Sequence, residues 1–93
     1  MIDGFDELSK MLKEAQDFAG EVDGVLVQLN FNPFDPSSIE TAIQTLNARV
    51  DEKASRYPRN DFIAEIAEGL KEEGRNSILE RAAEARLSAE DQK

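Results

Sequence analysis

Residues 25–31 read Val25-Leu26-Val27-Gln28-Leu29-Asn30-Phe31 and place the firmest constraint on how this chain folds. Apolar side chains occupy every second position, which is the period of a strand with one apolar face. Turn signals stand on both sides, with Asp23-Gly24 before the segment and Asn32-Pro33 after it. We therefore predict a strand at 25–31. Its inner, dimer-forming face would consist of the four alternating apolar residues, Val25, Val27, Leu29 and Phe31. Its outer face would offer a partner surface of three residues, Leu26, Gln28 and Asn30.

No second strand is predicted elsewhere, so the hydrogen-bonding partner of this strand must come from another chain. Backbone groups buried without a partner cost free energy, whereas each inner side chain gains about 1.5–3 kcal/mol on burial. Pairing with a second copy across a two-fold axis satisfies both demands by forming a two-stranded antiparallel ribbon. A strand from a different protein, or an extended segment without a ladder, is the alternative. In the ribbon, Val27→Asp is expected to abolish the dimer and the fold.

Helical periodicity covers most of the remaining chain, in the ranges 4–19, 36–56 and 61–87. The predicted fold is therefore α+β, mostly helical, in the order α-β-α-α and in one small domain of 93 residues. Residues 88–93 have nothing to bury and are expected to fray.

Local signals mark the ends of these helices. Asp3, Asp35 and Asn60 are the predicted N-caps, because their side chains can accept hydrogen bonds from the first free N–H groups of a helix. Pro36 suits the first helical position after Asp35.

Gly74 costs about 1 kcal/mol relative to alanine inside a helix, so we expect one long helix that is bent or loosened there. The alternative is a break at Gly74, with a fourth helix capped by Asn76 or Ser77.

The composition limits the chemistry that this chain can perform. It has 20 acidic and 11 basic residues, a net charge of −9, and no cysteine, histidine or tryptophan. These counts exclude a disulfide framework, a zinc site built on thiolate or imidazole, and catalysis by cysteine or histidine. The negative charge argues against nucleic acid and anionic membranes as partners. We expect no enzymatic activity, cofactor or metal.

The cellular compartment is predicted from two features, the charge of the N-terminal residues and the length of the apolar runs. Acidic residues stand where a signal peptide would carry basic ones, and no apolar run is long enough to cross a bilayer. We therefore expect a cytoplasmic protein.

Two groups of charged residues have both a structural and a functional interpretation. Four acidic residues could form a patch in the third helix, Glu65, Glu68, Glu72 and Glu73. A solvated helix face explains them, and so does an acidic inhibitor or nucleic-acid mimic that binds a basic site. Four basic residues surround the end of the second helix, Arg49, Lys53, Arg56 and Arg59. The helix dipole and an i,i+4 pair of Glu52 with Arg56 explain these, and a patch for an acidic partner or the other subunit is the functional reading.

The N-terminal residues Asp3-Gly4-Phe5-Asp6-Glu7-Leu8, followed by Lys10, Leu12 and Lys13, resemble the first helix of small prophage and phage-tail-associated proteins. The segments Asp23-Gly24 and Asp35-Pro36-Ser37-Ser38-Ile39-Glu40 resemble those of uncharacterised mobile-element proteins. The chain departs from tail-completion proteins in its shorter length and single strand. The resemblance implies a bacterial or phage origin and carries over no catalytic residue.

Together these observations predict a non-enzymatic, homodimeric interaction or assembly protein. The alternative is the acidic inhibitor or nucleic-acid mimic, which should bind basic targets with strong salt dependence. A metal-assisted enzyme is a third hypothesis, and it would require a thermal shift on adding a divalent ion.

Overall fold

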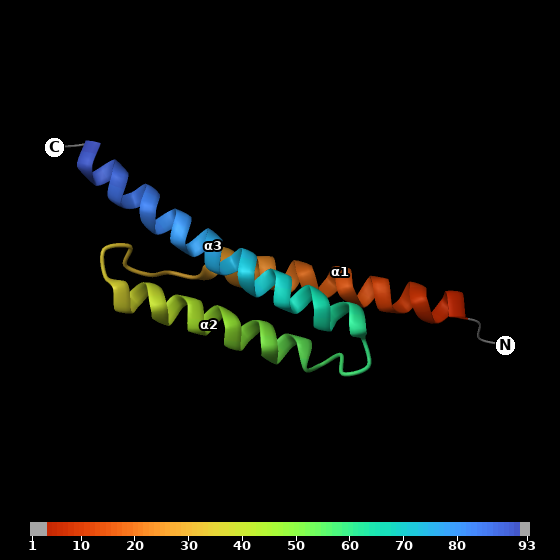
Figure 1. Cartoon of the computed structure of the whole chain (residues 1–93). Helices are drawn as coiled ribbons and strands as arrows, with labels where there is room; N and C mark the ends of the chain where they lie inside the picture. Colours follow the sequence, from red (N-terminus) through yellow and green to blue (C-terminus); the bar gives the residue numbers. More distant parts are fainter. Residues whose placement is uncertain (1–3, 92–93) are drawn as a thin grey trace.

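Three helices make up the computed structural model, which describes residues 4–91, and these residues contain no strand. α1 spans Gly4–Gln28, α2 spans Pro36–Ala54 and α3 spans Asp61–Asp91. Two short connections reverse the chain, so α1 and α3 run in the same direction and α2 runs against them (Figure 1). The fold is all-α and elongated, with extents of 68 × 21 × 17 Å.

The predicted strand at 25–31 is wrong. Residues 25–28 form the last turn of α1, and the chain is irregular from Leu29 to Asp35. Val27, which was expected inside a ribbon, is 83% exposed, whereas Leu26, which was expected outside, packs against the core. The two-stranded ribbon, and with it the α+β fold, is therefore absent from the part of the chain that the structure describes.

The segment fits a helix because its apolar residues also follow the helical period. Counted from Phe18, apolar side chains recur at +4, +7, +8 and +11, which places them on one side of a helix. These residues are Phe18, Val22, Val25, Leu26 and Leu29. All of them are buried in the core or packed against it. A helix also pairs its own backbone groups, which a lone strand cannot do.

Contacts from α3, rather than a glycine, secure the end of α1. The Arg81 guanidinium donates to the carbonyls of Leu26 and Leu29, at 3.5 and 3.3 Å, and lies 5.1 Å from the centre of the Phe31 ring. Arg86 Nε donates to the Pro33 carbonyl at 2.9 Å. α1 therefore continues through Gly20, where the sequence predicted its end, until α3 supplies partners for its final carbonyls.

The predicted start of α2 is confirmed. Asp35 is its N-cap, and Asp35 Oδ1 accepts hydrogen bonds from the Ser37 amide at 3.0 Å and the Ser37 hydroxyl at 2.9 Å. These bonds lower the pKa of the Asp35 carboxyl from its ordinary value. Asn60 likewise caps α3, since its Oδ1 accepts from the Ile63 amide at 3.3 Å. Asp3, the third predicted cap, lies outside the described residues.

α3 is continuous through Gly74, and the glycine has a packing role. A Cβ at this buried position would overlap Leu46 Cδ2 of α2 and lie 3.4 Å from Leu26 Cδ2 of α1. Its small size thus lets three helices approach one another closely. The helix also extends to Asp91, four residues past its predicted end at 87, and residues 92–93 lie outside the described part.

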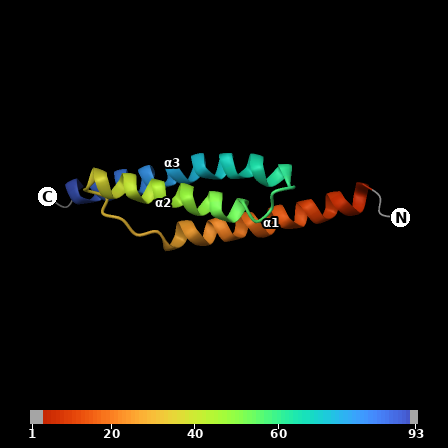
Figure 2. The same cartoon turned by 90° about the horizontal axis from the view of Figure 1, so that it is seen from below.

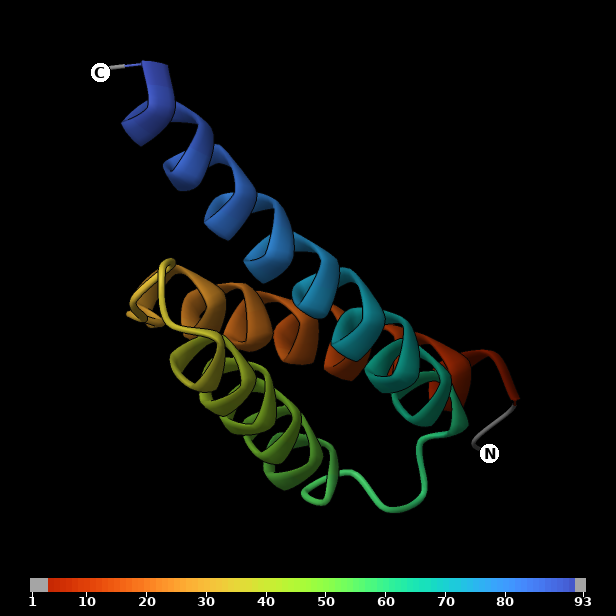
Figure 3. The ribbon, with the colours of Figure 1, turned by 60° about the vertical axis from the view of Figure 1, so that its left-hand side comes forward.

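The core runs along the line where the three helices meet. Its fully buried large side chains come from every helix: Phe18, Val22, Leu46, Val50, Ile63 and Ile78. In Figure 2 the N-terminal end of α1 extends past the end of α2 and the start of α3. In Figure 3 the C-terminal half of α3 rises away from both other helices.

Candidate interaction surface

Apolar side chains remain exposed on the N-terminal part of α1, which extends past the other helices (Figure 2), and on the C-terminal half of α3, which rises away from them (Figure 3). On α1, Phe5, Leu8 and Leu12 are 72%, 42% and 48% exposed. Their spacing of i, i+3 and i+7 places them on one side of the helix, and we name them the α1 face. On α3, Leu79 and Leu87 are 39% and 60% exposed, with the exposed Ala83 between them. These three form the α3 face.

Helical periodicity alone places these positions on the same apolar stripes as the buried residues, so it does not show that they are exposed. Helix length was the available signal. The 31 residues of α3 exceed the 19 of α2 by 12, which is about 18 Å at 1.5 Å per residue. A shorter α2 therefore cannot cover the whole apolar stripe of either neighbour.

The predicted partner surface of Leu26, Gln28 and Asn30 is not formed as one face. Leu26 packs against the core at the end of α1, while Gln28 and Asn30 are exposed. The predicted dimer residues are separated too, because Val25, Leu29 and Phe31 pack against the core of their own chain and Val27 projects into solvent.

The predicted acidic patch lies on the exposed side of α3, and one of its members is neutralised by a salt bridge. Lys71 Nζ lies 2.7 Å from Glu68 Oε2 and 2.8 Å from Asp51 Oδ1 of α2. Hydrogen bonds to Asp51 and then to Glu68 raise the pKa of the Lys71 amine. Glu65, Glu72 and Glu73 are exposed. The patch therefore combines solvated carboxylates with a bridge between two helices.

The basic residues at the end of α2 connect it to α1. Arg56 lies 3.8 Å from Glu21 and 3.7 Å from Glu52, so the predicted i,i+4 pair is confirmed. Lys53 lies 3.7 Å from the same Glu21 carboxylate. At least half of the basic group thus makes contacts within its own chain, and the exposed Arg49 and Arg59 complete it.

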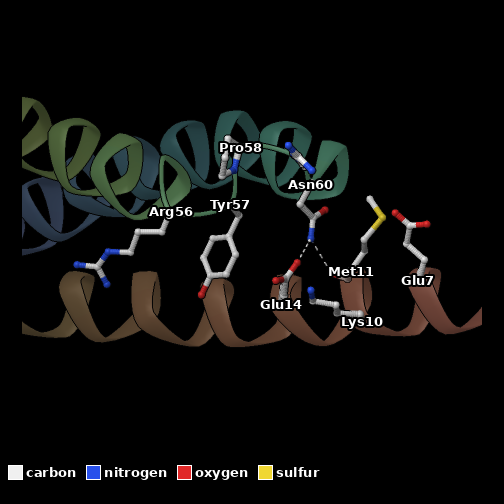
Figure 4. Close-up of a pocket in the computed structure, with 9 residues that line it drawn as sticks. Glu7, Lys10, Met11, Glu14, Arg56, Tyr57, Pro58 and Asn60 are labelled. Carbon is white, nitrogen blue, oxygen red and sulfur yellow. Dashed lines mark hydrogen bonds between the residues drawn. The ribbon is translucent and has the colours of Figure 1, made fainter. Parts of the chain in front are cut away.

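A shallow hollow of about 290 Å³ lies between the first half of α1 and the connection from α2 to α3. Figure 4 shows the Tyr57 ring lying toward α1, and Asn60 Nδ2 donating to the Met11 carbonyl and to Glu14 Oε1. These two bonds measure 2.9 and 3.1 Å. Charged side chains of both signs surround it: Glu7, Lys10, Glu14, Arg56 and Arg59.

This hollow has no arrangement that points to catalysis. The chain contains no imidazole or thiol, so the hollow lacks the usual general base and the usual strong nucleophile. Across residues 4–91 no group of three or more acidic side chains is placed to hold a metal ion. Within the same range, no helix combines the length and apolar character that crossing a membrane requires. The open apolar faces are therefore the features that most clearly indicate a binding role.

Comparison with known proteins shows which family this sequence resembles. Residues 2–89 match the YuaX family. The chain is 39% identical over 85 residues to the uncharacterised protein YuaX of Escherichia coli (strain K12), an alignment that covers 91% of this chain and 88% of that protein. No solved structure matches the chain.

Proposed function

The chain belongs to the YuaX family, and we propose that it is a non-enzymatic protein that acts in assembly as a homodimer. The observation that carries this proposal is the pair of open apolar faces at opposite ends of the molecule. Single exposed apolar residues are common on protein surfaces and need no explanation. Several apolar residues on one helix face mark a site of association. Removing their surface from water on binding gains about 25 cal/mol per Å².

The lack of enzymatic activity is part of the proposal, and the chemistry of the side chains supports it. The one hollow described above is open and lined by charges of both signs. Serine or threonine nucleophiles would need a neighbouring base, and the chain contains no histidine to provide one. A cytoplasmic location and a phage-related origin remain proposals that rest on the N-terminal residues.

The alternative is an acidic inhibitor that occupies a basic site on a target. The exposure of Glu65, Glu72 and Glu73 supports it, whereas the pairing of Glu68 with Lys71 reduces the charge of the patch. Binding through carboxylates weakens as salt screens the charges. Binding through buried apolar faces does not weaken in this way. Salt dependence of target binding therefore distinguishes the two functions.

Light scattering on a sizing column, over a series of protein concentrations, tests the homodimer. We expect a mass of twice 10.4 kDa that decreases toward the monomer mass only on dilution. The matched controls replace one exposed apolar residue inside and one outside the faces. Leu8→Glu should shift the equilibrium toward monomer, whereas Val27→Glu should not. A single mass of 10.4 kDa at every concentration would refute the proposal.

A further inference from the structure

We propose that the homodimer forms by packing the α1 face of each copy against the α3 face of its partner, with the two helices antiparallel. This inference rests on the proposed function and specifies its interface. The α1 face is Phe5, Leu8 and Leu12, and the α3 face is Leu79, Ala83 and Leu87, all of them exposed in the single chain.

The direction of the helices supports this arrangement. α1 and α3 run in the same direction within one chain, and the open faces lie at opposite ends of the molecule (Figures 1 and 2). A two-fold axis perpendicular to the long dimension reverses the partner. The partner's α1 then runs antiparallel to α3, with its N-terminal half beside the C-terminal half of α3. The symmetry makes the same contact twice and leaves no face open.

The two faces also agree in length. Phe5 to Leu12 covers about 10.5 Å along its helix, and Leu79 to Leu87 covers about 12 Å, at 1.5 Å per residue. In antiparallel register, Phe5 lies level with Leu87, Leu8 with Ala83 and Leu12 with Leu79. Large side chains thus meet at both ends of the contact, and Leu8 meets a small residue at its centre.

Charge favours this pairing over contact between two α1 faces. The two cations of α1, Lys10 and Lys13, lie in the half that carries the α1 face. On α3, Arg81 and Arg86 donate hydrogen bonds to carbonyls of their own chain. The charged residue next to Leu79 is the acidic Glu80. In the proposed register Lys13 is level with position 78, so it lies about 3 Å along the axis from Glu80. Local attraction of this kind offsets part of the repulsion between two chains of charge −9.

Disulfide trapping tests the register directly, because the chain has no cysteine of its own. Leu12 adjoins Met11, whose carbonyl bonds to Asn60 at the start of α3. Leu79 lies 19 residues beyond Asn60, about 28 Å along the helix, so no disulfide can join positions 12 and 79 within one chain. We expect the Leu12→Cys/Leu79→Cys variant to form a covalent dimer on mild oxidation, and either single variant to form little. Leu8→Cys alone should cross-link only if two α1 faces meet.

Charge reversal gives a second measurement that leaves the apolar contacts in place. Lys13→Glu and Glu80→Lys should each raise the dimer dissociation constant by about 3- to 30-fold, since each pair occurs twice in the dimer. Combining both reversals should restore the dissociation constant to within a few-fold of the original. Lys10→Glu is the matched control, because it changes the same charge on the other side of α1, where Lys10 lines the hollow.

The outcomes separate the two proposals. A dimer that cross-links between positions 12 and 79, and that the combined reversal restores, supports the interface. A dimer that cross-links through Leu8→Cys, or that ignores both reversals, overturns this interface while the homodimer stands. A chain that is monomeric at every concentration overturns the proposed function, and the interface fails with it.

Discussion

Gly74 and Gly69 stand in the same helix but in opposite environments. A Cβ at Gly74 would overlap the side chain of Leu46, which is fully buried. Nothing lies within 4 Å of the place where a Cβ would stand at Gly69. One glycine therefore serves the contact between helices, and the other only lowers the stability of its own helix.

Gly74→Ala should destabilise the protein by about 1–2 kcal/mol, because overpacking costs about 1–3 kcal/mol and the gain in helix propensity returns up to about 1 kcal/mol. Gly69→Ala should stabilise it by up to about 1 kcal/mol. Urea denaturation followed by circular dichroism measures both. Equal changes in the free energy of unfolding for the two substitutions would show that Gly74 is not at a point where the helices pack closely.

At the scale of the element, the last turn of α1 depends on which side of the helix each apolar residue occupies. Leu26 packs against the core and Val27 is 83% exposed. Val27→Asp should cost less than about 1 kcal/mol, most of it from an acidic group near a helix C-terminus. Leu26→Asp should unfold the chain or cost several kcal/mol, because it places a charge against the core. Thermal denaturation measures the stability of both variants. If Val27→Asp were the more destabilising of the two, the result would favour a strand at 25–31 over the helix.

The start of α2 should depend on pH through Asp35. Its pKa in the folded protein lies below the ordinary value of 3.8, because the Ser37 hydroxyl and amide hydrogen-bond to the ionised carboxylate. A lowered folded pKa contributes stability that is present above the unfolded pKa and is lost as the pH falls through the folded pKa. Asp35→Ala should therefore differ most from the natural chain above pH 3.8, and the difference should shrink in stronger acid.

Asp35→Asn provides the control for this experiment. Asparagine retains a side-chain oxygen that can cap the helix, but it has no proton to gain in this range. Its stability relative to Asp35→Ala should therefore stay constant across the same interval. Urea denaturation at several pH values would contradict the assignment if the Asp35→Ala difference grew as the pH fell.

At the scale of the whole molecule, the net charge of −9 opposes association of two copies. Added salt screens this long-range repulsion, and it leaves the burial of apolar faces largely intact. The dimer dissociation constant should therefore decrease as sodium chloride is raised from low to physiological concentration. Sedimentation equilibrium at several salt concentrations measures it. A dissociation constant that rises steeply with salt would show that attraction between charges, rather than the apolar faces, holds the copies together.

Local signals in the sequence were enough to predict the starts of two helices. Asp35 and Asn60 cap their helices through their own side chains, so a few neighbouring residues contain the whole interaction. The composition limits the chemistry whatever fold the chain adopts, because a chain without histidine or cysteine cannot place either residue at a site.

Tertiary packing decided the conformation of residues 25–31 and the exposure of the two faces. Both a strand period and a helical period pass through that segment. The packing of Leu26 against the core and the hydrogen bonds from Arg81 to the end of α1 favour the helix. Exposure of Phe5, Leu8 and Leu12 depends on where α2 ends, which lies more than forty residues away along the chain. Periodicity shows that a side of a helix is apolar, but only the lengths and placement of neighbouring helices determine which part of it is covered.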